Sequence, residues 1–186
     1  MFQNPPPDSE AAARLAIDLE PHSALARYNL GYLLEEDPTR AGEAETAYRQ
    51  AIDLDPNNAR FVYRLGLLLH EKLVRHPDAE IAYRRAIDLA PDNPFYYYGG
   101  LVSLLVQQSR RPEALPLAAK MRALLTAGRL WYGLATLDAI LGNTDAAIEH
   151  LSQAAREGKL DREWARIDPD LASIRDEPRF IEIVGA

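Results

Sequence analysis

The chain has 186 residues, a formal net charge of −7 and a pI near 5.1. An acidic chain repels phosphate backbones, so we expect no nucleic-acid partner, and the absence of cysteine excludes disulfide frameworks and cysteine metal sites. No stretch approaches the roughly 20 apolar residues of a membrane-spanning helix, so we expect no membrane partner.

The N-terminal residues 1–7 include three consecutive prolines, and we expect them to form a flexible tail. No apolar run follows a basic start, which argues against a signal peptide. Together with the lack of a membrane span, this predicts a cytoplasmic protein.

A four-residue word recurs along the first half of the chain. Ala-Ile-Asp-Leu occurs at Ala16–Leu19, Ala51–Leu54 and Ala86–Leu89, spaced by 35 residues, and each copy is followed by one residue and a proline. Self-similarity at such a period is typical of stacked repeats, in which each unit buries its apolar face against its neighbours.

Each repeat is predicted to contain two helices. In the first full repeat, Ser23 is a suitable N-cap for a helix over about 23–36, because its hydroxyl can accept from a free amide of the first turn. Asp37-Pro38 ends that helix, since proline cannot continue it. The second helix is expected over about 42–54, and Pro56 closes the repeat.

The positions within each repeat resemble the tetratricopeptide repeat family. Leu30-Gly31 in the first helix recurs as Leu65-Gly66, and the second helix carries alanine, tyrosine, alanine and a closing proline, namely Ala44, Tyr48, Ala51 and Pro56, then Ala79, Tyr83, Ala86 and Pro91. The resemblance implies an all-α fold, a right-handed α-solenoid of antiparallel helix pairs. We expect Gly31 to face Ala44, and Tyr48 to fill the space between neighbouring pairs.

The expected organisation follows the repeats: half-repeat 8–23, repeats 24–58, 59–93, 94–127 and 128–161, and a C-terminal helical cap at 162–186. The third repeat is degenerate, with Gly99-Gly100-Leu101 where Leu-Gly is expected and Pro116 early in its second helix. The cap resembles the closing segment of many bacterial tetratricopeptide proteins. We expect it to cover the last repeat with Trp164, Leu171, Ile174, Phe180 and Ile181.

The sequence contains no constellation typical of catalysis. His-Glu-x-x-His spacing, a phosphate-binding loop and a Gly-x-Ser-x-Gly elbow are all missing. We therefore expect no enzyme, no metal site and no cofactor.

The resemblance places ligands on first-helix positions that point away from the second helix. A tyrosine stands at one such position in all four repeats, which predicts a tyrosine ladder along a concave groove that binds a peptide or partner protein. The predicted groove residues are Tyr28, Asn29, Tyr32, Arg60, Tyr63, Arg64, Phe95, Tyr98, Arg129 and Tyr132. The arginines suit an acidic partner.

Four alternatives accompany this prediction. The period of 35 also suits RNA-reading pentatricopeptide repeats, but the acidic charge and the Leu-Gly, Ala, Tyr, Ala, Pro pattern argue against them. The Lys and Asn clamp with which co-chaperone members hold a carboxyl terminus is replaced here, with only Arg64 fitting it. The half-repeat suggests the arm of a larger enzyme or secretion machine, or a scaffold that self-associates to a homo-oligomer through Ala12, Leu15, Ala16 and Leu19.

Overall fold

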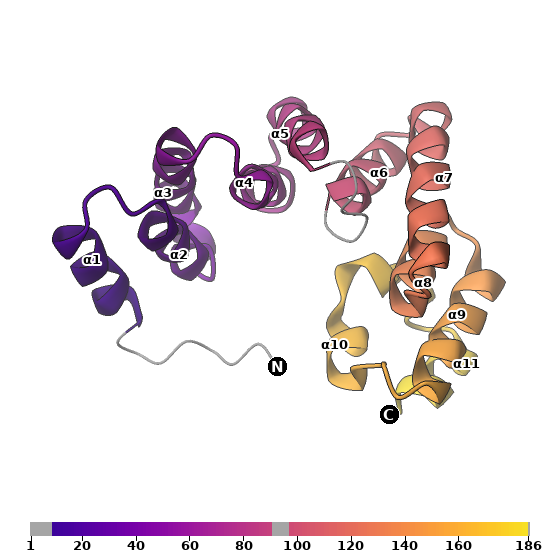
Figure 1. Cartoon of the computed structure of the whole chain (residues 1–186). Helices are drawn as coiled ribbons and strands as arrows, with labels where there is room; N and C mark the ends of the chain where they lie inside the picture. The colour runs from indigo at the N-terminus through magenta and orange to yellow at the C-terminus, as the bar shows by residue number, and fades with distance from the viewer. Residues whose placement is uncertain (1–8, 91–96, 186) are drawn as a thin grey trace. The chain divides into compact units, whose positions relative to one another are not determined.

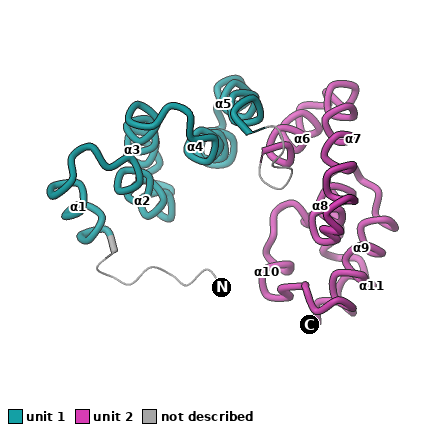
Figure 2. The backbone as a smooth tube through the Cα atoms, in the orientation of Figure 1, with its two compact units in different colours: residues 1–91 teal, residues 92–186 magenta. Residues whose placement is uncertain are grey.

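The computed structural model describes residues 9–90 and 97–185, and these residues contain helices and turns with no strand (Figure 1). The chain divides into two compact units, residues 1–91 and 92–186, drawn in different colours in Figure 2. Phe95, one of the predicted groove residues, lies outside the described residues.

Unit 1 consists of one helix followed by two helix pairs. Its elements are α1 (Ser9–Leu19), α2 (Ala24–Leu34), the 3-10 turn η1 (Pro38–Arg40), α3 (Ala41–Leu54), α4 (Ala59–Glu71) and α5 (His76–Leu89). The pairs are α2 with α3 and α4 with α5. Ser23 caps α2 as predicted, its hydroxyl accepting from the amide of Ala26 at 3.3 Å. Asp37 caps the 3-10 turn that begins at Pro38.

The inside of each pair in unit 1 is built around a glycine and a tyrosine. A Cβ on Gly31 would lie 2.8 Å from ring carbons of Tyr48, and a Cβ on Gly66 would lie 2.8 Å from the ring of Tyr83. The side chain nearest to Gly31 is thus Tyr48, where Ala44 was expected. The small residue accommodates a fully buried ring within its own pair.

Unit 2 contains two further pairs and a C-terminal segment. The pairs are α6 (Tyr97–Gln107) with α7 (Arg111–Ala127) and α8 (Trp131–Ile140) with α9 (Thr144–Arg156), and they are followed by α10 (Arg162–Ile167), η2 (Pro169–Ile174) and α11 (Pro178–Val184). Helix α7 continues through Pro116, which lies inside it.

The C-terminal segment packs on the last pair, with η2 against α8 and α11 against α9. Leu171, Ile174 and Phe180 are buried there, as expected, together with Ala165 and Val184. Trp164 and Ile181, which were also expected to cover the last repeat, are 39% and 45% exposed.

Candidate functional site

The helices α2 and α4 carry most of the predicted binding residues that belong to unit 1. Residues three or four apart lie on the same face of a helix, so Leu25, Asn29 and Tyr32 share a face of α2, while Arg60 and Arg64 share a face of α4. We call the face formed by Leu25, Asn29, Tyr32, Arg60, Tyr63 and Arg64 the first-helix surface. Leu25, Asn29 and Arg60 are exposed, and Tyr32, Tyr63 and Arg64 are half-buried.

Two arginines of α4 lie over two tyrosines of α2. The guanidinium carbon of Arg60 is 5.1 Å from the centre of the Tyr28 ring, and that of Arg64 is 4.7 Å from the centre of the Tyr32 ring. The Nε of Arg60 also donates to the hydroxyl of Tyr28 at 3.2 Å. Cations at this distance are attracted to the face of an aromatic ring, so the two guanidinium groups are held one helical turn apart on aromatic supports.

A buried carboxylate fixes one of these arginines. Glu35, at the end of α2, accepts from Nη2 of Arg64 and, at 2.8 Å, from the hydroxyl of Tyr48. Burial raises the pKa of Glu35, although the charge of Arg64 opposes the shift. Burial also raises the pKa of the Tyr48 phenol, which therefore acts as a hydrogen-bond donor. The network joins both helices of the first pair to α4 and holds Arg64 in place.

The Nε of Arg64 is buried and has no hydrogen-bond acceptor among residues 9–90 and 97–185. A buried donor without an acceptor costs about 1–3 kcal/mol. Arg64 thus donates to Glu35 through Nη2, while its Nε has no acceptor within the same residues.

The second pair places histidine where the first places Glu35. His70 Nδ1 lies 3.2 Å from the hydroxyl of Tyr83, as Glu35 lies beside that of Tyr48. Both residue pairs are 13 apart in sequence. The buried tyrosine of each pair therefore bonds to the last turn of the first helix, through a charged carboxylate in one pair and an imidazole in the other.

Two rings of the predicted tyrosine ladder are buried. Tyr28 is 5% exposed and stacks on Phe61 of α4, with ring centres 4.8 Å apart, and Tyr98 of α6 is 1% exposed. As an open row of four rings along a groove, the ladder is wrong. Tyr28 instead packs between the consecutive first helices α2 and α4: its ring stacks on Phe61, and its hydroxyl accepts from Arg60.

The predicted residues of unit 2 have internal partners. Tyr132 donates to the carboxylate of Asp168 at 2.6 Å, and burial, followed by this bond, raises the pKa of its phenol. Arg129 is exposed in the turn before α8, where its backbone has φ 51°, and its guanidinium lies 3.9 Å from Glu157. In the last pair, the tyrosine position is thus engaged by the C-terminal segment.

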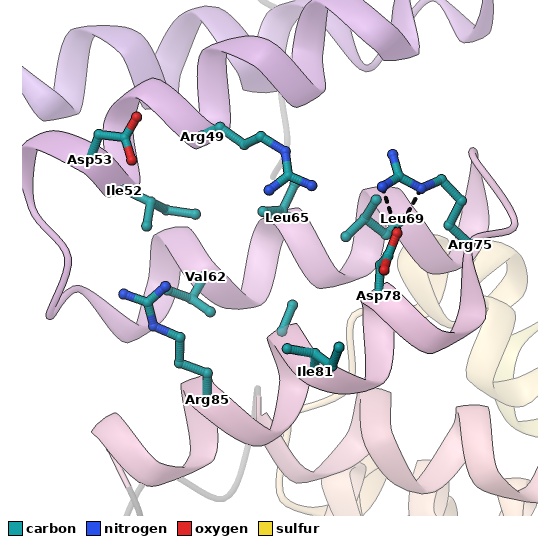
Figure 3. Close-up of a pocket in the computed structure, with 11 residues that line it drawn as sticks. Arg49, Ile52, Asp53, Val62, Leu65, Leu69, Arg75, Asp78, Ile81 and Arg85 are labelled. Atoms are coloured by element: carbon teal, nitrogen blue, oxygen red, sulfur yellow. Dashed lines mark hydrogen bonds and ion pairs between the residues drawn. The ribbon is translucent and has the colours of Figure 1, made fainter.

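Sequence reasoning missed a pocket of about 340 Å³ in unit 1, between α3, α4 and α5 (Figure 3). Its apolar lining is Ile52, Val62, Leu65, Leu69, Ile81 and Ala82, and its charged lining is Arg49, Arg75, Arg85, Asp53 and Asp78. The pocket contains none of the predicted groove residues. One signal could have indicated it: Ile81 interrupts the polar face of a second helix, and it is 68% exposed.

The pocket arginines already have acceptors. Glu45 accepts from Arg49 and Arg75, Asp78 also accepts from Arg75, and Arg85 donates to the carbonyl of Pro56 at 2.8 Å. A second pocket, of about 390 Å³, lies in unit 2 and is lined by residues of α9, α10 and α11. The first pocket thus combines apolar and charged side chains, and its three arginines are already engaged.

Within residues 9–90 and 97–185, no group of three or more His, Cys, Asp or Glu side chains could hold a metal ion. No helix within the same residues combines the length and the apolar character that crossing a membrane requires.

Two consecutive helix pairs share a glycine–tyrosine crossing, in which a glycine of the first helix lies against a tyrosine of the second. Together with the arginines that lie over tyrosine rings, this arrangement defines a helical-repeat protein. Residues 39–94 match the family model described as tetratricopeptide repeat. This segment of the chain is therefore similar to tetratricopeptide repeats. No curated protein matches the sequence.

Solved structures that resemble the chain in fold include the following two. One is the crystal structure of MamA, with a TM-score of 0.58 and 17% sequence identity, over 81% of this chain and 86% of the other. The second is the crystal structure of YrrB, described as a TPR protein with an unusual peptide-binding site, with a TM-score of 0.57 and 18% identity, over 94% of this chain and 89% of the other. The expected fold class, an all-α helical-repeat solenoid, is confirmed.

Proposed function

We propose that the chain is a non-enzymatic interaction module that binds a peptide or a partner protein on the first-helix surface of unit 1. The observation that carries the proposal is the pair of arginines, Arg60 and Arg64, held over the rings of Tyr28 and Tyr32. The likeness in fold to YrrB, a protein described as having a peptide-binding site, supports a peptide ligand.

The arrangement suits recognition because the side chains are ordered before the ligand arrives. Ordering a long side chain on binding costs about 0.5–1.5 kcal/mol. Tyr28 and Glu35 hold the two arginines in advance, so that cost is reduced. Arginine and tyrosine are also among the residues most enriched where binding energy is concentrated. Leu25, which is 57% exposed, adds an apolar contact on the same face.

A pair of matched substitutions tests the location. Peptides selected from a displayed random library on the full chain are measured by calorimetry against Leu25→Asp and Ile81→Asp. Both residues are exposed and apolar, but Leu25 lies on the first-helix surface and Ile81 lines the pocket between α3 and α5. We expect Leu25→Asp to weaken binding and Ile81→Asp to leave it unchanged. The reverse result would transfer the binding site to the pocket.

Self-association is a second candidate function, favoured by the exposure of α1. Leu15 and Leu19 are both exposed on one face of this helix, beside Ala12 and Ala16. An exposed row of leucines is a common contact between protein copies. If α1 mediates a homo-oligomer, the sedimentation coefficient should rise with concentration in the wild type and remain monomeric in Leu15→Glu. A monomer at every concentration tested would reject this function.

A further inference from the structure

We infer that the first-helix surface selects peptides with an acidic side chain and that Arg60 binds its carboxylate through both terminal nitrogens. This inference rests on the proposed function and names the chemistry of the ligand. It commits to a protein ligand whose acidic residue lies beside an apolar one, because Leu25 and Arg60 occupy equivalent positions, 35 residues apart, on α2 and α4.

Arg60 differs from the other arginines of unit 1 in its partners. Most of them bind a carboxylate, namely Arg14, Arg40, Arg49, Arg64, Arg75 and Arg84. Arg27 donates to Gln50 and the carbonyl of Pro21, and Arg85 donates to a carbonyl. Within residues 9–90 and 97–185, the bond that Arg60 makes is the one from its Nε to Tyr28.

That single bond leaves the two terminal nitrogens of Arg60 available to a ligand. The planar guanidinium presents its two terminal nitrogens as a fork that matches the two oxygens of a carboxylate. The Nε bond and the ring of Tyr28 fix the plane of the fork. Arg60 is also exposed, which leaves the fork open to a ligand carboxylate.

The neighbouring charges place the acid at Arg60 and not at Arg64. Glu35 already neutralises Arg64, and the field of Glu36 reaches the Tyr32 ring that supports it. A ligand carboxylate near Arg64 would therefore meet a negative charge from two glutamates. Arg60 instead bonds to the neutral hydroxyl of Tyr28, and the residue that follows Tyr28 on α2 is the uncharged Asn29.

The test uses the displayed random-peptide library on the full chain. The tightest peptides are resynthesised with each Asp or Glu replaced by Asn or Gln, and calorimetry gives the Kd of each for the wild type, Arg60→Ala, Arg60→Lys and Arg84→Ala. Arg84 is the matched control, because it is exposed on α5 and pairs with Glu80. Circular dichroism of each variant verifies that its helices are intact.

Neutralising one acidic residue of the peptide should weaken binding to the wild type about tenfold and leave binding to Arg60→Ala unchanged, since the bond is already lost. Arg60→Lys should bind with intermediate affinity, because a point charge replaces the fork, and Arg84→Ala should match the wild type. Equal losses on wild type and Arg60→Ala, or tight peptides without acids that respond to Leu25→Asp, would overturn this inference alone. Peptides that respond to neither substitution would overturn the proposed function as well.

Discussion

Gly66 lies against the ring of Tyr83, and the neighbouring elements leave that ring no room to move because it is fully buried. The same is true of Gly31 and Tyr48. Glycine is needed here for the close approach of two helices, even though glycine inside a helix costs about 0.5–1 kcal/mol relative to alanine. By contrast, a Cβ at Gly42 of α3 would meet no atom within 4 Å.

We predict opposite effects for the same substitution at two glycines. Gly66→Ala should lower the free energy of unfolding by about 1–3 kcal/mol, because the added methyl forces the Tyr83 ring or the helix to shift. Gly42→Ala should cause no loss, and a gain of up to about 1 kcal/mol, through helix propensity alone. Urea unfolding of both variants measures the difference. Equal effects at the two positions would contradict the close packing described for α4 and α5.

Glu35 predicts a pH dependence that most carboxylates do not show. Burial raises its pKa in the folded state, so the folded chain binds this proton more tightly than the unfolded chain. Its contribution to stability is complete at low pH and declines as pH rises from about 4.3, the unfolded value, through the folded pKa. Subtracting the unfolding free energies of Glu35→Gln from those of the wild type at each pH should show this downward slope. A difference that rises with pH would be the opposite of what burial causes.

At the scale of single elements, α1 makes its shortest ionic contact through Glu10. Glu10 receives Nη1 and Nη2 of Arg40, at 2.7 and 3.0 Å, so the helix is joined to the turn that precedes α3. Hydrogen bonds from Arg40, then from Arg14, lower the pKa of Glu10 to about 2. Such a group stabilises the folded state above its unfolded pKa and ceases to do so as pH falls.

We predict that α1 opens locally in acid and in Arg40→Met. Between pH 4.5 and about 2, protonation of Glu10 should raise the amide exchange rate of α1 before that of α3. In Arg40→Met, α1 should exchange fast at neutral pH too, because the contact is absent. Hydrogen exchange with mass spectrometry follows each helix. Unchanged protection of α1 in the variant would show that apolar packing alone holds it.

The elements of the first repeat were predictable because each has a local cause. Ser23 supplies a capping oxygen and Pro38 prevents the first helix from continuing, and both effects depend only on residues close in sequence. The use of each surface was less predictable. Tyr28 and Tyr63 occupy the same repeat position, yet Tyr28 is buried and Tyr63 is half-buried, because exposure depends on Phe61 and other partners that are distant in sequence. The arginine supports and the pocket between α3 and α5 depend on the same distant contacts.

At the scale of the whole molecule, we expect a destabilising substitution in one unit to leave the stability of the other unit unchanged. In stacked helix pairs, stability is roughly a sum of contributions from each repeat and from its immediate neighbours. Leu151 is fully buried in the core that α8, α9 and the C-terminal segment share, and Leu68 is buried in α4. Substituting one of these leucines therefore destabilises one unit directly, and the effect on the other unit can be measured separately.

Leu151→Ala should cost about 2–5 kcal/mol and raise amide exchange in α8 and α9, while α2 and α3 keep their protection. Leu68→Ala should give the reciprocal pattern. Hydrogen exchange of the full chain, one helix at a time, distinguishes these patterns. A uniform rise along the chain in both variants would mean that all pairs unfold in one cooperative step.

The glycine–tyrosine crossing extends to the pairs that lack both residues. Moving 35 residues on from Gly66 and Tyr83 gives Leu101 and Ala118, and the last pair has Ala135 and Leu151 at the matching places. All four are buried, and the bulky residue lies in the first helix of the α6–α7 pair and in the second helix of the last pair. The combined volume of the two side chains is similar in each pair. A repeat can therefore replace its characteristic glycine and tyrosine and keep the packing of its two helices.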